Sequence, residues 1–203
     1  MEIVEMVLSG KVNKDIAGEL SKHGIQALGL SGKDGNLIVA RKKYLYQEGE
    51  KIDIGHVGEV VSVNEKLLCD LLEKGYLPVI SPVGCDPEGQ SYNINADYVA
   101  ASVSAVLKAE KLILLSDVRG LYKDIQDPAS FISVIDVQTA KEYLRSGIIQ
   151  GGMIPKMECC IEAIQKGTKN VHLIDGRNPH SLLLEIFTDK GIGTMVKGDE
   201  VDG

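Results

Sequence analysis

The first part of the chain carries a helical pattern of hydrophobic positions. Apolar side chains recur about once per helical turn between residues 2 and 22, at Ile3, Val4, Val7, Leu8, Val12, Ile16 and Leu20. This pattern predicts an amphipathic helix, and His23 with Gly24 supplies a stop signal. A short strand is expected over residues 25–30. A helix that starts at the first residue without an N-cap indicates that the chain begins inside a larger architecture.

The pattern changes to alternation over residues 36–61. β-Branched and charged side chains alternate there on both sides of the polar, Gly-containing turn QEGEKIDIG. Such alternation around a turn predicts a β-hairpin that is exposed on one face.

From residue 64 onward, helical segments alternate with continuous apolar runs. Helices are predicted over residues 65–75, 97–109, 137–147, 151–167 and 180–188, the first of them capped by Asn64. Strands are predicted over residues 76–84, 111–118, 170–175 and 192–198, with a polar excursion over 122–136. Continuous apolar strands between helices are typical of a mostly parallel sheet covered on both faces. We therefore predict one α/β domain spanning residues 1–203.

Composition and charge narrow the functional classes. The net charge of −7 argues against a nucleic-acid binder, which needs a basic face. No apolar run is long enough to span a membrane and the start is not a signal peptide, so we expect a cytoplasmic protein without a membrane partner. Cys69, Cys85, Cys159 and Cys160 form no CxxC pair. We expect reduced, mostly buried thiols and no disulfide or metal framework.

Two loops at predicted strand ends carry carboxylates, and each permits two interpretations. Ligands of α/β sheets bind where strands end and helices begin. Asp97, in the segment SYNINAD, either caps the following helix or serves a site. Asp117, directly after KLILLS, either organises a metal, ribose or lysine, or begins a turn.

A third loop, GGMIPK over residues 151–156, opens a helix with two glycines and a lysine. The glycines allow close approach of a ligand to the backbone. A lysine in the first turn opposes the helix dipole at a cost of roughly 0.3–1 kcal/mol, which a phosphate partner at Lys156 would offset. The alternative is a solvated lysine. No P-loop, protein-kinase motif or GxSxG motif is present. The residues alone indicate a phosphate-handling α/β enzyme.

Several motifs taken together resemble acetylglutamate kinase of the amino-acid kinase superfamily. These are SYNINAD, KLILLSDVRGLY, GIIQGGMIPKMECC, VHLIDGR and LLLEIFTDKGIGTM, supported by GLSGKDGNLIVA and DIGHVGEV. The likeness is collinear and covers essentially the whole chain. It implies a three-layer α/β/α sandwich with a mostly parallel central sheet. It also implies the ATP-dependent phosphorylation of the γ-carboxylate of N-acetyl-L-glutamate in arginine biosynthesis, with Mg²⁺ bridging the ATP phosphates.

The resemblance also assigns site residues. Asn93 matches a position that binds acetylglutamate, Asp97 an aspartate that organises catalytic lysines, and Lys156 a lysine that stabilises the transferring phosphoryl group. No residue is assigned as a metal ligand. The residues that match nucleotide-binding loops are Asp117, Val118, Arg119, Gly120, Leu121, Tyr122, Ile148, Ile149 and Gln150.

Regulation and assembly form a second part of the resemblance. His172, Glu185 and Gly191 match positions that bind arginine as an inhibitor in arginine-sensitive members. The alternative is that Glu185 is a solvated helix residue and His172 a strand histidine with satisfied hydrogen bonds. The resemblance further implies a homodimer built through the central sheet.

One family feature has no match in these residues: an N-terminal strand with a Lys-Gly-Gly motif and a Gly-rich loop. We therefore expect an N-terminally shortened kinase that is catalytically incomplete by itself. Two other interpretations stay open. One is another acyl-phosphate-forming amino-acid kinase, of aminoadipate or carbamate type, and the other is a non-catalytic nucleotide- or arginine-binding module.

Overall fold

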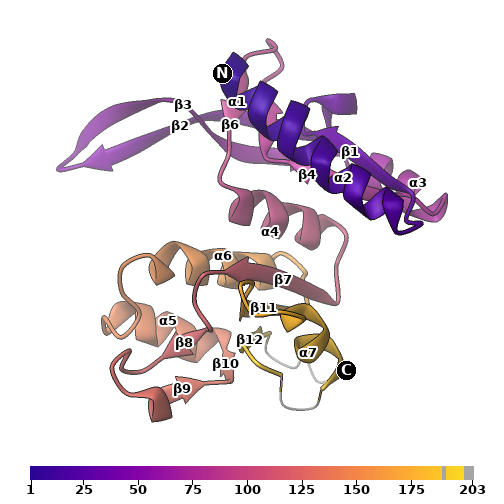
Figure 1. The fold of residues 1–203 in the computed structure, drawn as a ribbon. Coiled ribbons are helices and arrows are strands. Elements are labelled where there is room, and N and C mark those ends of the chain that lie inside the picture. The colour runs from indigo at the N-terminus through magenta and orange to yellow at the C-terminus, as the bar shows by residue number, and fades with distance from the viewer. Residues whose placement is uncertain (189–190, 199–203) are drawn as a thin grey trace. The chain divides into compact units, whose positions relative to one another are not determined.

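The computed structural model describes residues 1–188 and 191–198 and divides into two compact units, Met1–Val103 and Ser104–Gly203 (Figure 1). Helix α4 (Ala96–Val106) contains the boundary between them. The single domain expected over the whole chain stays a prediction.

The predicted N-terminal helix is present, and its middle turn is wider than an α-helix. It runs through α1 (Glu2–Glu5), a π-helical segment η1 (Met6–Val12) and α2 (Asn13–Lys22). Asn13 is buried, and its side-chain amide donates to the carbonyls of Leu30 and Val79 at 3.2 and 2.7 Å. These carbonyls belong to β1 (Ala27–Ser31) and β4 (Leu77–Ser81), which pair in parallel. One buried amide thus fixes the helix to both strands.

The predicted hairpin is also present, as β2 (Ile38–Gln47) and β3 (Glu50–Val63). It joins β5 (Val83–Cys85) and β6 (Ser91–Asn93) in a closed four-stranded arrangement. The short helices η2 (Asp34–Asn36) and α3 (Glu65–Glu73) complete this unit. The side chain of Asn64 accepts the Leu67 amide at 3.1 Å, which confirms the predicted cap.

The prediction of one continuous strand over residues 76–84 is wrong. It forms two strands, β4 and β5, in two different sheets. Pro82 lies between them, and a proline has no amide to donate to a ladder. Its carbonyl instead accepts the Ile94 amide at 3.0 Å, at the end of β6.

The second unit is built on a four-stranded sheet of order β10-β12-β11-β7. The strands are β7 (Lys111–Ser116), β10 (Val134–Asp136), β11 (Asn170–Asp175) and β12 (Thr194–Lys197). The pairs β10–β12 and β7–β11 are parallel, and β11–β12 is antiparallel. The polar excursion contains η3 (Pro128–Ser130) and a small ladder of β8 (Leu121–Tyr122) and β9 (Phe131–Ile132).

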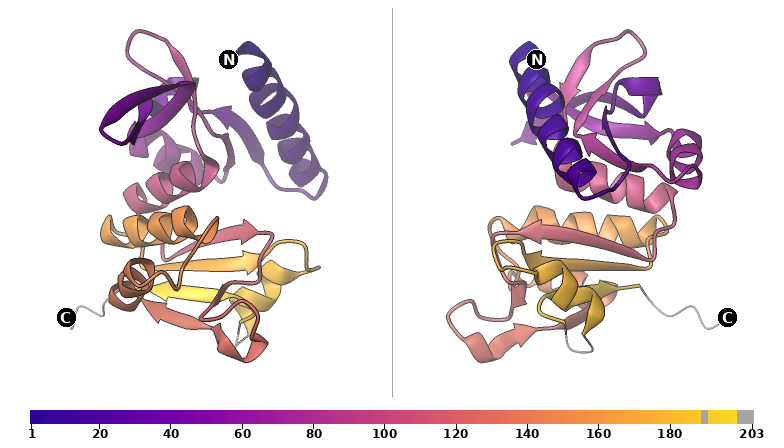
Figure 2. Two further views of the ribbon diagram at one scale, coloured as in Figure 1. Left: turned by 90° about the vertical axis from the view of Figure 1, so that its left-hand side faces the viewer. Right: turned by 45° about the vertical axis from the view of Figure 1, so that its right-hand side comes forward.

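Helices cover both faces of this sheet. Figure 2 shows α6 (Met153–Gln165) on one face and α7 (Ser181–Phe187) on the other, with α5 (Val137–Arg145) beside α6. Val171, Leu173 and Ile174 of β11 have no exposed surface, and neither do Met157 and Cys160 of α6. Aliphatic strands buried between helices confirm the predicted α/β/α class.

The four cysteines differ in burial. Cys159 and Cys160 are fully buried, whereas Cys69 and Cys85 are only partly covered.

Among residues 1–188 and 191–198, no helix is long and apolar enough to cross a membrane.

Candidate active site and its relatives

The parallel pair β7–β11 brings two loops together at one edge of the sheet. Ser116 is in register with Asp175, so both strands end side by side. The Gly176 amide donates to the Ser116 carbonyl at 2.9 Å, just beyond the ladder. The carboxyl ends of parallel strands are where α/β proteins bind ligands.

The predicted nucleotide loop, residues 117–122, leaves β7 at this edge. Asp117 and Arg119 are exposed, and the Arg119 guanidinium lies 4.4 Å from the Phe131 ring centre. Leu121 is only 3% exposed, so its side chain belongs to the core and only its backbone can face a nucleotide. Gly120 has no room for a side chain, since a β-carbon would lie 2.4 Å from Thr194 Oγ1. The two remaining members, Val118 and Tyr122, are half-buried.

The second predicted nucleotide segment, residues 148–150, connects α5 to α6. The amides of Ile148 and Ile149 both donate to the Tyr143 carbonyl, at 3.0 and 3.1 Å, and thereby close the end of α5. Ile148 and Gln150 are exposed, whereas Ile149 is 2% exposed. Ile149 therefore anchors the segment by packing, and its neighbours present the surface.

Lys156 follows on the first turns of α6, where it is half-buried. The N-cap residue Gly152 has no side chain to bond the helix amides, and no acidic residue lies in the first turn. Gly151 has φ +57°, and no atom lies within 4 Å of where a β-carbon would stand on Gly151 or Gly152. The start of α6 thus combines a positive dipole end, a cation and open space, a combination suited to an anion.

Asn93 and Asp97 lie on the connection from β6 to α4 in the first unit. Asn93 ends β6, paired with Val83 and Val57. The cap of α4 is Asn95, whose side chain accepts the Asp97 amide at 2.8 Å. The Val99 amide donates to the Asn95 carbonyl at 3.2 Å. The capping function that the sequence left open for Asp97 therefore belongs to Asn95.

The sequence analysis assigned no function to Asp175 and Arg177, which lie beside the predicted nucleotide loop. The Arg177 guanidinium donates to both oxygens of Asp175, at 2.9 and 2.8 Å, and its backbone amide donates as well. These bonds lower the pKa of Asp175 to about 2. Arg177 has a raised pKa, chiefly through Asp175 and in part through Asp117. The signal was an acidic residue, Asp175, at the end of the buried strand NVHLID.

The three predicted arginine-binding positions are brought together around α7. His172 Nδ1 lies 2.6 Å from Glu185 Oε1. Glu185 Oε2 accepts the amides of Ile192 and Gly193, and Gly191 is adjacent. Glu185 is 8% exposed, so the alternative of a solvated helix residue is wrong.

The carboxylate of Glu185 stays ionised in this setting. Burial alone would raise the pKa of Glu185, but hydrogen bonds from His172 and from the two amides hold it below its usual value. The stabilisation from these bonds is therefore present above the pKa of an unfolded glutamate. It is lost as the pH falls through the lower folded value.

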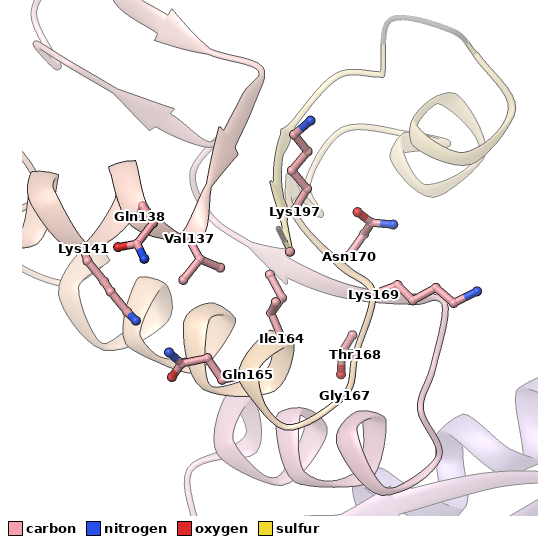
Figure 3. Close-up of a pocket in the computed structure, with 11 residues that line it drawn as sticks. Val137, Gln138, Lys141, Ile164, Gln165, Gly167, Thr168, Lys169, Asn170 and Lys197 are labelled. Carbon is pink, nitrogen blue, oxygen red and sulfur yellow. The ribbon is translucent and has the colours of Figure 1, made fainter. Parts of the chain in front are cut away.

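A cavity of about 600 Å³ lies at the opposite edge of the same sheet (Figure 3). It is formed by the start of α5, the end of α6 and the first residues of β11, and none of the predicted site residues lines it. Lys169 and Lys197 line it but extend away from its centre in Figure 3. It lies at the amino ends of β7 and β11, away from the edge where the predicted nucleotide loops meet. Within the described part of the chain, no group of three His, Cys, Asp or Glu side chains could hold a metal ion.

Comparison with known proteins shows the family of this chain. Residues 1–175 match the Amino acid kinase family. The chain is 52% identical to acetylglutamate kinase from Moorella thermoacetica, over 97% of this chain and 68% of that protein. It is 54% identical to acetylglutamate kinase from Nostoc sp., over 98% of this chain and 65% of that protein. The chain thus spans about two thirds of the length of these relatives.

A solved structure shows the same fold at lower identity. N-acetylglutamate synthase from Neisseria gonorrhoeae, complexed with coenzyme A and N-acetyl-glutamate, aligns with a TM-score of 0.71 and 23% identity. The alignment covers 92% of this chain and 43% of that chain. A second structure of that synthase is a complex with coenzyme A and L-arginine.

The kinase predicted from the collinear motifs is confirmed by these matches, in which long stretches of sequence agree with curated enzymes of one activity. The chain belongs to the amino acid kinase family, as one of its acetylglutamate kinases.

Proposed function

We propose that this protein transfers the γ-phosphoryl group of ATP to the γ-carboxylate of N-acetyl-L-glutamate in the cytoplasm, with the nucleotide bound at the carboxyl ends of β7 and β11. The observation that supports this most directly is that two segments meet at one edge of the sheet. They are the 117–122 loop, which leaves β7, and the Asp175–Arg177 pair, which ends β11. Asp117 and Arg119 are exposed there.

The proposed chemistry needs alignment and charge neutralisation more than a base. A carboxylate is already a nucleophile and attacks the γ-phosphorus directly, while the bond from phosphorus to the bridging oxygen of ADP breaks. Negative charge spreads over the equatorial oxygens of the transferring group. Lys156 and the amide end of α6 are suited to stabilise that charge, because a fixed cation costs no reorganisation during the reaction.

Asn93 and Asp97 are proposed to serve the acceptor and the catalytic cations, respectively. A side-chain amide such as that of Asn93 both donates and accepts, which suits an N-acetyl group and a carboxylate. Asp97 is not needed as the cap of α4, since Asn95 performs that function. Its carboxylate can then act by charge.

Mg²⁺ is proposed to arrive with the ATP phosphates. It usually keeps several waters and uses substrate phosphates with one or two carboxylates, not an all-protein cage. The described residues contain no such cage, and a phosphate-borne ion does not require one. The ion would neutralise the phosphates while the residues named above orient the two substrates.

Arginine is proposed as an inhibitor that binds near His172, Glu185 and Gly191. A carboxylate is the usual partner of a guanidinium group. Both oxygens of Glu185 already accept hydrogen bonds, so arginine would have to share or displace them. This competition favours weak binding.

We also propose a homodimer. The N-terminal helix of the first unit has apolar side chains that are largely exposed, namely Ile3, Met6, Val7, Val12 and Ile16, at 76%, 67%, 46%, 43% and 48%. Burying each such side chain in an interface contributes about 1.5–3 kcal/mol. A second copy of the chain is the proposed partner, through this helix and the sheet beside it.

The first prediction concerns Lys156. Lys156→Ala should lower kcat by about 10²–10³-fold while changing the KM for acetylglutamate little, because the charge it meets develops in the transition state. Steady-state kinetics of acetylglutamate-dependent ADP release measures both constants. Lys141→Ala, on the neighbouring helix at the opposite edge, is the matched control and should leave kcat unchanged. Equal kcat values for both variants would make Lys156 an ordinary surface lysine.

The second prediction separates charge from capping at Asp97. Asp97→Asn should nearly abolish turnover and leave the midpoint of thermal unfolding unchanged. Asn95→Ala should instead lower the free energy of unfolding by about 1 kcal/mol, because α4 loses its cap. Kinetics and thermal unfolding of both variants provide the measurement. A stable and fully active Asp97→Asn protein would remove Asp97 from the catalytic machinery.

The third prediction joins assembly and arginine. Light scattering should give the mass of a dimer, and the double variant Ile3→Glu/Met6→Glu should shift it toward the monomer. Calorimetry should show weak arginine binding that disappears in Glu185→Ala. A hexamer, or arginine binding that Glu185→Ala leaves intact, would contradict this assignment.

A further inference from the structure

Glu185 holds the entry of β12 in place from the interior of the second unit. Its side chain is 5% exposed. One carboxylate oxygen faces His172 of β11 at 2.6 Å, and the other accepts the Ile192 and Gly193 amides at 2.7 and 3.0 Å. A single residue of α7 therefore connects the helix, the central strand and the turn before β12.

The same turn holds the predicted nucleotide loop. The Ile192 carbonyl accepts Arg119 Nε at 3.3 Å, and Thr194 Oγ1 accepts the Leu121 amide at 2.8 Å. The hydroxyl of Thr194 in turn donates to the Ile132 carbonyl at 2.6 Å. The loop is thus attached to residues 192–194 at two points, one before Gly120 and one after it.

Steric constraints leave this turn little freedom. A β-carbon on Gly193 would stand 2.2 Å from the Leu173 carbonyl oxygen, and one on Gly191 would stand 2.7 Å from Glu185 Oε2. Contacts this close are incompatible with a side chain. The turn therefore packs directly on β11 and on the carboxylate, so its position depends on both.

The protonation of the pair follows from its surroundings. The ionised carboxylate of Glu185 can only accept, so His172 Nδ1 must carry the proton. His172 Nε2 is buried with no hydrogen-bond partner among the described residues. His172 therefore acts as a donor to Glu185 through Nδ1.

We propose that Glu185 is a positioning residue for the nucleotide loop, acting through the turn at residues 192–194 on Arg119 and Leu121. It touches no substrate in this account. The proposal rests on the proposed function only in taking residues 117–122 as the loop that contacts ATP. It also provides a physical connection by which a ligand that competes for Glu185 alters nucleotide binding.

The test compares three variants by hydrogen exchange and by calorimetric ADP binding. Glu185→Ala removes all three hydrogen bonds and should speed exchange of the Leu121, Ile192 and Gly193 amides. A loop that is no longer held in its binding conformation has to be ordered when the ligand binds, and we expect ADP affinity to fall by about tenfold. Glu185→Gln should restore both readouts substantially, because its carbonyl can accept the two amides.

The control is Thr168→Val, which removes the buried hydrogen bond between Ser104 and Thr168 (2.8 Å) at the other edge of the sheet. It should lower global stability without changing exchange at Leu121 or ADP affinity. If Glu185→Ala at matched stability affects Leu121 no more than this control does, the positioning function is overturned.

A fourth variant keeps the test sharp if Glu185→Ala does not fold. Thr194→Val preserves the Glu185 bonds and removes the two hydrogen bonds of the Thr194 hydroxyl, from the Leu121 amide and to the Ile132 carbonyl. It should speed Leu121 exchange and weaken ADP binding while Ile192 and Gly193 stay protected, and an unaffected loop would overturn the proposal. Absence of ADP binding by the unmodified protein would count against the proposed function alone, since exchange at Leu121 still measures the connection.

Discussion

The parallel pairing of β7 with β11 is the constraint on which the rest of the second unit depends. Its register sets Ser116 beside Asp175, so the loops that leave both strands begin at the same edge. β11 is aliphatic and buried over nearly its whole length, as is typical of a strand inside a parallel sheet, whereas β7 is the last strand of the sheet and only its Leu114 is buried. Two pairs of charged residues that are far apart in the sequence therefore lie at the same edge. Asp117 and Arg119 follow β7, whereas Asp175 and Arg177 lie at the end of β11.

The site also depends on how firmly α6 is held. Met157, Cys160 and Ala163 have no exposed surface, so the body of the helix is fixed in the core. Gly151 and Gly152 leave the space before its first turn open. The helix thus presents its positive end and Lys156 at a fixed place. Electrostatic stabilisation of a transferring phosphoryl group requires such a preorganised cation.

Hydrophobic periodicity predicted most of the fold, because apolar side chains recur with the period of the helix or strand whose buried face they form. The N-terminal helix, the hairpin, the Asn64 cap and the alternating elements after residue 64 were all predicted from it. The break at Pro82 was not predicted, because the apolar run continues across this residue. Proline lacks a backbone N–H, and this has an effect only when the strands pair through hydrogen bonds.

The site was harder to predict than the fold. Motif resemblance assigned Lys156 and residues 117–122 to the site, and these assignments stay predictions. Local sequence could not distinguish Asn95 from Asp97 as the cap of α4, since both side chains cap well. The resemblance singled out Glu185, but its burial could not be predicted from the sequence, because its contacts with Ile192 and Gly193 exist only in the tertiary structure. Asp175 and Arg177 carried a signal, an acidic residue at the end of a buried strand, that is too common to stand alone.

We propose that ATP binds at the carboxyl ends of β7 and β11 and not in the cavity of about 600 Å³ at the opposite edge of the sheet. Hydrogen exchange of the protein with and without MgATP tests this most directly, because it reports on both edges in one experiment. We expect slower exchange over residues 117–122 and 148–153, with residues 137–141 and 164–170 unchanged. Protection confined to residues 137–141 and 164–170 would contradict it.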